Sequence, residues 1–149
     1  MATEVFSCFH DASKKVSSGS KLATLFVPDG HWFIVGKVVV HNDNTSTYQL
    51  LTARLIAGAD FDTSYVRLGP SGVHSADIMA LAFTVVHTFP GNSNQAQNAI
   101  DLVITLDPAG PNAFISAELL KITAFRVDSR WPVFLRVRQS AGAVNYMSS

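Results

Sequence analysis

A chain of 149 residues has the usual length of one folded domain, so we expect a single hydrophobic core. Its 11 basic and 11 acidic side chains leave no net charge, which argues against nucleic acid or an anionic membrane as a partner. Charged residues make up only 15% of the chain, against about 25% in typical globular proteins, and hydrophobic residues make up 48%. A monomer needs more polar surface than this, so we expect copies of the chain or a partner to cover part of it.

Cys8 is the only cysteine, so no disulfide can form within the chain. We therefore expect a reducing compartment or a fold that is stable without cross-links, with Cys8 buried as a small apolar side chain. The first 15 residues hold no basic segment followed by an apolar run, so we expect no secretory signal peptide. No stretch approaches the roughly 18 apolar residues of a membrane helix. The compartment stays open between the cytoplasm and release by a non-classical route.

The first predicted strand covers residues 21–27 and is closed by Pro28, Asp29 and Gly30, a turn sequence in which Gly accepts a positive φ. The second covers residues 31–42. Its apolar residues fall on both faces, with Trp32, Ile34, Val38 and Val40 on one and Phe33, Val35 and Val39 on the other. This pattern predicts a strand that is covered on both sides, or one whose outer face contacts another subunit.

The later predicted strands follow in chain order at residues 48–57, 64–68, 78–89, 100–106 and within 114–127. The last segment is long for one strand, so we expect a bend or bulge near Glu118. Helices over residues 75–83 and 117–125 are the alternative, although neither has a good cap and stop signal.

Seven or eight strands with regular turn signals are typical of a sandwich or barrel rather than of a βαβ protein. We predict an all-β fold, a two-sheet antiparallel sandwich of the jelly-roll kind. Residues 1–149 form one domain in this prediction, with the core at about residues 20–127 and a C-terminal extension at 128–149. An immunoglobulin-type sandwich is the alternative, but its paired cysteines are absent.

The segment Val27–Asn42 (VPDGHWFIVGKVVVHN) resembles the proline, glycine and aromatic turn and the following strand of the tumour-necrosis-factor and complement globular-head jelly rolls. The strings ARLIAGADFD, LAFTVVHTFP and KITAFRV resemble blocks of small bacterial proteins of that type. The resemblance covers about residues 20–127. It implies a ten-strand jelly roll that assembles as a homotrimer through one apolar face and binds proteins or sugars without catalysis. The segment after residue 127 departs from the family, whose domains end with the last core strand.

Residues that could catalyse a reaction form no recognisable motif. The five histidines are not paired at the spacings of common zinc sites, and no nucleophile elbow or phosphate loop occurs. We therefore expect no enzyme activity and no cofactor. Asp60 and Asp62 are weak candidates for a calcium site, because Ca²⁺ prefers several oxygen ligands, but aspartate is also a common turn former.

Two polar loops suit hydrogen bonding to sugar hydroxyls. They contribute Asn42, Asn44, Asn92 and Asn94 as candidate ligand-binding residues, with Trp32 or Tyr48 as the aromatic platform that a sugar ring would need. The same residues are ordinary turn formers, which is the alternative interpretation.

Four arginines fall between Arg126 and Arg138, and aromatic residues lie among them. The candidate partner-docking residues are Arg130, Trp131, Phe134, Arg136 and Arg138, because arginine and aromatic residues are enriched at interfaces. The alternative is an edge strand over residues 133–138 whose arginines keep it soluble.

The leading hypothesis is a non-enzymatic binding or assembly module, a trimer that presents loops to a protein or carbohydrate ligand. The alternatives are a carbohydrate-binding lectin and an enzyme with a cavity between the sheets.

Overall fold

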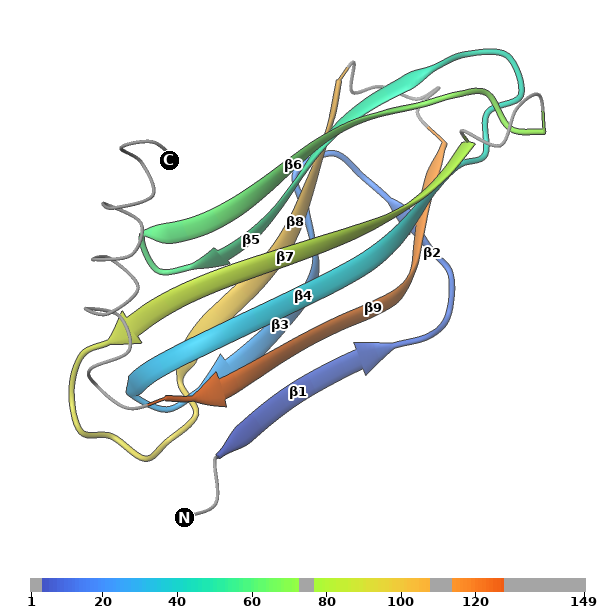
Figure 1. Ribbon diagram of the computed structural model, residues 1–149. Coiled ribbons are helices and arrows are strands. Elements are labelled where there is room, and N and C mark those ends of the chain that lie inside the picture. The colour runs from blue at the N-terminus through green and yellow to red at the C-terminus, as the bar shows by residue number, and fades with distance from the viewer. Residues whose placement is uncertain (1–3, 73–76, 108–113, 128–149) are drawn as a thin grey trace.

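The computed structural model describes residues 4–72, 77–107 and 114–127. Nine strands in these ranges form two antiparallel sheets that pack face to face (Figure 1). In chain order they are β1 (Val5–His10), β2 (Lys14–Val16), β3 (Ser20–Val27), β4 (Gly30–Asn42), β5 (Gln49–Ala57), β6 (Asp60–Leu68), β7 (Ile78–Phe89), β8 (Asn98–Asp107) and β9 (Ile115–Arg126). Among the described residues, no helix is long and apolar enough to cross a membrane.

The strand order defines the fold. One sheet has the order β1-β9-β4-β7, with β2 also paired with β9, and the other has the order β3-β8-β5-β6. All of these pairs are antiparallel. The chain passes repeatedly from one sheet to the other, and the last described strand, β9, returns to lie between β1 and β4. This is the order of a jelly roll, so the predicted two-sheet antiparallel sandwich is confirmed.

The core fills the space between the sheets, because alternate residues of each strand point inward. Its largest fully buried side chains include Trp32, Ile34, Leu51, Leu55, Leu68, Ile100, Leu102, Ile104, Ile115 and Ile122. The indole N–H of Trp32 donates to the carbonyl oxygen of Pro28 at 3.0 Å, and its ring meets that of Phe6 edge-on at 5.6 Å between centroids. Phe6 lies on β1, so a strand that precedes the predicted core of residues 20–127 packs against the same core.

Six of the seven predicted strands agree with the structure to within two residues at each end. The fourth is longer than predicted, because β6 begins at Asp60 and not at residue 64. The helical alternatives are wrong over residues 78–83 and 117–125, where β-branched and aromatic residues pair across strands. Residues 75 and 76 lie outside the described residues. β1 and β2 were not predicted from the sequence. Both strands are short, lie at the edge of their sheet and bury few side chains, so their apolar pattern is weak.

β9 contains the bulge that was expected near Glu118. Lys37 of β4 pairs with Lys121 of β9, whereas Val39, two residues further along β4, pairs with Glu118, three residues earlier on β9. The extra residue is accommodated by Leu119, which has a φ of 50°. An L-residue in this left-handed region costs about 1–2 kcal/mol, so the surrounding sheet must hold Leu119 there.

Candidate functional site

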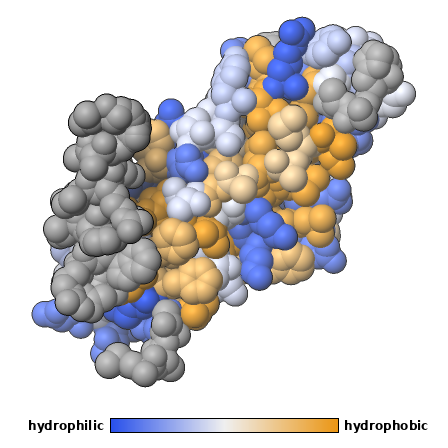
Figure 2. All heavy atoms as spheres, viewed as in Figure 1, coloured by the Kyte–Doolittle hydropathy of each residue, from blue (hydrophilic) through white to orange (hydrophobic). Residues whose placement is uncertain are grey.

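The outer face of the β1-β9-β4-β7 sheet carries a row of apolar side chains that crosses all four strands. Val5 of β1 pairs with Phe125 of β9, Phe125 pairs with Phe33 of β4, and Phe33 pairs with Val86 of β7. The two phenylalanine rings lie 6.4 Å apart between centroids, and Val5 is 50% exposed. Figure 2 shows hydrophobic groups spread over this side of the molecule, interrupted by hydrophilic ones. These four residues are called the apolar row below.

A pair of lysines interrupts the apolar surface. Lys37 and Lys121 lie opposite each other on the outer face, on adjacent strands. A shallow hollow of about 350 Å³ lies beside them, and Val35, Gly36, Lys37, Lys121, Thr123 and Phe125 line it. Within the described residues, neither lysine forms an ion pair. Like charges directly opposite in a sheet repel each other, so a carboxylate from outside this chain would stabilise the pair.

The outer face of the other sheet also exposes aromatic rings, but arginine side chains of that sheet cover two of these rings. The guanidinium of Arg54 lies 4.8 Å from the ring centre of Phe61, and that of Arg67 lies 4.4 Å from the ring centre of Tyr48. Such contacts stabilise an exposed ring by about 0.5–1 kcal/mol and leave a charged surface above it. The apolar row has no comparable cover from a described cation, so it is the better candidate for an interface.

Two of the candidate sugar-binding residues are buried, and that prediction is wrong for them. Trp32 is 0% exposed, because its ring lies between the sheets. Asn42 is also 0% exposed, and its amide donates to the carbonyl oxygens of Thr47 and Gly69, each at 2.9 Å. Both residues therefore hold the fold together and cannot contact a ligand.

The other candidates for sugar binding are half-buried (Asn44) or exposed (Tyr48, Asn92 and Asn94), but they do not form one site. Asn44 and Tyr48 belong to the loop after β4, whereas Asn92 and Asn94 belong to the loop after β7. Because β4 and β7 run antiparallel, these loops lie at opposite ends of the sandwich (Figure 1). The side-chain oxygen of Asn44 accepts hydrogen bonds from the backbone N–H groups of residues 46 and 47, which is turn chemistry. Carbohydrate binding stays a prediction.

Asp60 and Asp62 connect the edge strands of the two sheets. A carboxylate oxygen of Asp60 lies 2.7 Å from Nδ1 of His87, and Asp62 accepts a hydrogen bond from the backbone N–H of Thr84 at 2.9 Å. Both partners lie on β7, so these carboxylates join β6 to β7. In the described part of the chain, no three His, Cys, Asp or Glu side chains come close enough to hold a metal ion. Each carboxylate uses one oxygen for these contacts, and calcium binding at Asp60 and Asp62 stays a weak prediction.

The five predicted docking residues, Arg130, Trp131, Phe134, Arg136 and Arg138, lie outside the described residues. Cys8 is half-buried on β1, and burial raises the pKa of its thiol more than the hydrogen bond with the backbone of Ile122 lowers it. A raised pKa keeps the thiol protonated, and the protonated form is a poor nucleophile.

Sequence reasoning missed one polar cluster. His41 contacts Asp43 through Nδ1 at 2.5 Å and Asp77 through Nε2 at 3.4 Å. The spacing of His41 and Asp43 signals only half of this cluster, because Asp77 lies 36 residues away and is brought in by the pairing of β4 with β7.

No family model and no curated protein matches the chain. Among solved structures, it is similar to the structure of the infectious bursal disease virus Gx strain, with a TM-score of 0.45 and 18% identity over 86% of this chain and 32% of that chain. It is also similar to the VP2 subviral particle of infectious bursal disease virus, with a TM-score of 0.29 and 13% identity over 85% of this chain and 41% of that chain. The chain therefore spans less than half the length of either structure.

Likenesses of this size assign no function, and the strand order itself defines the protein as a jelly-roll sandwich. That order is common to jelly rolls in general. The narrower resemblance to tumour-necrosis-factor and complement heads, with its ten strands, stays a prediction.

Proposed function

We propose that this chain is a non-enzymatic assembly module whose copies associate through the outer face of the β1-β9-β4-β7 sheet. The observation that carries the proposal is the apolar row, which places Phe33 and Phe125 side by side on a sheet face turned away from the core. Removing such a face from water is favourable by roughly 25 cal/mol for each Å² of apolar surface. Aromatic residues are also enriched at the centres of protein interfaces.

The occupant of this face is a second copy of the same chain. The outer face carries its own complementary charges, because Glu118 lies opposite Val39 on the same side of the sheet as Lys37 and Lys121. A copy turned against this face offers a carboxylate to the lysine pair. The chain has no net charge, so its copies do not repel one another at long range.

The resemblance described above implies three copies, and we adopt a trimer as the proposed state. Contact through a sheet face leaves the ends of the sandwich free. The polar loops at residues 43–48 and 90–97 lie at those ends, so the assembled molecule still presents both to a protein or carbohydrate ligand.

Sedimentation velocity over about 1–100 μM protein tests the proposal. We expect the wild-type chain to sediment as a species of three times 16.1 kDa. In the double variant Phe33→Thr/Phe125→Thr, threonine keeps a high strand propensity but removes both rings, so we expect dissociation to single chains.

The matched control is Phe26→Thr/Phe61→Thr, which removes two half-exposed rings from the outer face of the other sheet. This control should sediment like the wild type, and circular dichroism should report β structure in all three proteins. A wild-type chain that stays at 16.1 kDa throughout, or a control that dissociates while the first variant does not, contradicts the proposal.

A further inference from the structure

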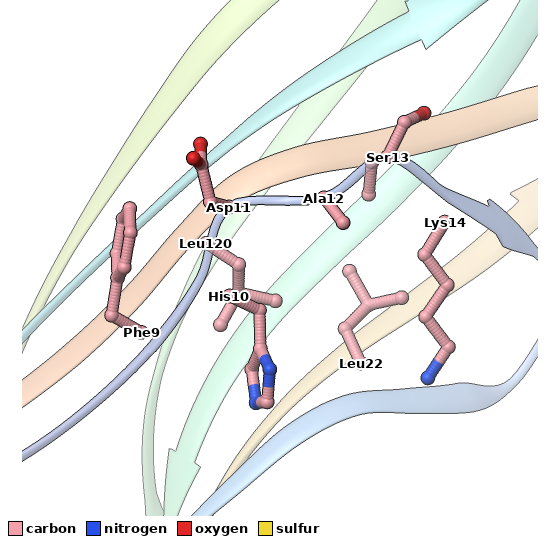
Figure 3. Close-up of a pocket in the computed structure, with 9 residues that line it drawn as sticks. Phe9, His10, Asp11, Ala12, Ser13, Lys14, Leu22 and Leu120 are labelled. Atoms are coloured by element: carbon pink, nitrogen blue, oxygen red, sulfur yellow. The ribbon is translucent and has the colours of Figure 1, made fainter.

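A pocket of about 370 Å³ opens at the edge of the sandwich, at the connection between β1 and β2. Phe9, His10, Asp11, Ala12, Ser13, Lys14, Leu22, Ala117 and Leu120 line it (Figure 3). This pocket lies at an edge between the two sheets and shares no lining residue with the hollow on the outer face.

The bulge in β9 creates this pocket. β1 pairs with β9 as far as His10, opposite Leu120, and β2 resumes at Lys14, opposite Ala117. Residues 11–13 connect the two strands across the bulged position and make none of the β9 pairs. The sheet edge is interrupted there, and the space between the sheets becomes accessible.

The floor of the pocket is apolar and belongs to the core. Leu22 of β3 is 6% exposed, and Ala117 and Leu120 of β9 are each 4% exposed. These three residues are already nearly out of water, so the surface removed from water on binding would mainly be that of the ligand's own apolar chain.

Two basic residues, His10 and Lys14, lie beside this apolar floor. His10 and Lys14 pair with inward-facing residues of β9, so their side chains project from the inner side of the edge. Figure 3 shows His10 and Lys14 on the same side of the chain as Leu22, whereas Asp11 and Ser13 point to the other side. The carboxylate of Asp11 therefore does not neutralise Lys14, and no described residue forms an ion pair with either basic residue.

We propose that this pocket binds a small monocarboxylate with an apolar chain. The carboxylate contacts the ammonium of Lys14 and the imidazole of His10, and the apolar chain lies on Leu22, Ala117 and Leu120. Charge-assisted hydrogen bonds of this kind are about twice as strong as neutral ones. One anionic end and one apolar body match the two parts of the pocket.

A simpler account of the two basic residues exists. Inward-pointing charges on an edge strand discourage pairing with another chain, and they need no ligand for that purpose. The two accounts differ in what they predict for an added carboxylate, because an edge-protecting lysine has no preference for one apolar compound over another.

The test is a titration of the ¹⁵N-labelled protein with sodium octanoate, followed through backbone amide shifts. We expect saturable shifts confined to residues 9–14, 22, 117 and 120. Lys14→Gln should weaken octanoate binding roughly tenfold or more, because a hydrogen bond to a charged group contributes about 1.5–3 kcal/mol. Lys14→Arg should retain most of the affinity, and octanol and octylamine should bind more weakly than octanoate.

The matched control is Lys15→Gln, which removes the same charge one residue away, from a side chain that lies over the ring of Phe114 at 5.0 Å. This variant should bind octanoate like the wild type. Equal binding of octanol and octanoate, no effect of Lys14→Gln, or no shifts at the pocket would overturn the proposal. The Lys14→Gln variant should sediment like the wild type. A loss of octanoate binding in this variant can therefore be distinguished from a loss of assembly.

Discussion

At the scale of single residues, the ring of His41 lies between two carboxylates, those of Asp43 and Asp77. A neutral imidazole has one N–H and can donate to only one partner, whereas the protonated ring can donate to both Asp43 and Asp77. Burial lowers the pKa of His41, but the hydrogen bonds and charges of Asp43 and Asp77 outweigh it and raise the pKa above 6.5. Asp77 also accepts a hydrogen bond from the backbone N–H of Gly72 at 3.0 Å, so the cluster ties β4 to the segment before β7.

This cluster predicts a pH dependence of stability. Because the pKa of His41 is higher in the folded state, its contribution is fully present below the unfolded value of 6.5 and is lost as the pH rises through the folded value. We expect the free energy of unfolding in urea to fall as the pH rises above 6.5, and His41→Gln to remove part of that fall.

The control is His31→Gln, because Nδ1 of His31 contacts the hydroxyl of Thr88 at 2.7 Å and, among the described residues, His31 forms no ion pair with a carboxylate. This variant should keep the wild-type slope. An unchanged slope in His41→Gln would mean that the two carboxylates do not hold the protonated ring.

At the scale of elements, the packing of β4 over β5 depends on a missing side chain. A Cβ atom on Gly36 would lie 3.1 Å from one methyl carbon of Leu55 and 3.3 Å from the other. Leu55 is 0% exposed, so its methyl groups fill the space that the glycine leaves between the sheets. The two residues are one packing unit, although they lie on strands of different sheets.

Their coupling can be measured with a double-mutant cycle by urea unfolding. Leu55→Ala should cost about 2–5 kcal/mol, because it leaves a cavity in the core. Gly36→Ala should destabilise the wild type but cost at least about 0.5 kcal/mol less in the Leu55→Ala background, where its methyl group enters that cavity. Additive effects would show that Leu55 moves aside freely.

At the scale of the whole molecule, assembly and stability are linked. A partner that binds only the folded chain stabilises it by mass action, and this holds for copies of the same chain. We therefore expect the Tm of the wild type to rise with protein concentration and that of Phe33→Thr/Phe125→Thr to stay constant. Differential scanning fluorimetry over a hundredfold range of concentration checks this, and a constant wild-type Tm would count against the proposed interface.

The sequence predicted the layers of the sandwich better than its edges. The alternation around Trp32 and Phe33 identified an inner and an outer face of β4, because period two survives in any strand with one face in the core. Periodicity within one strand cannot predict that His41 contacts Asp77, because the register between β4 and β7 brings these two residues together. It also cannot predict that His10 and Lys14 lie at one pocket, because the bulge in β9 opens that pocket. The prediction that Trp32 stacks on a sugar is wrong for a related reason. Periodicity shows which residues of a strand share a face, but which of the two faces is buried depends on where the other sheet packs.

The position of β9 has a consequence for synthesis of the chain on the ribosome. β9 lies between β1 and β4, so these two strands have no neighbour on that side until residues near 126 have been made. The pairing of Val5 with Phe125 joins the two ends of the described chain. Contacts between residues so distant in sequence make folding slow, and a nascent chain that stops before β9 leaves two open strand edges exposed to aggregation.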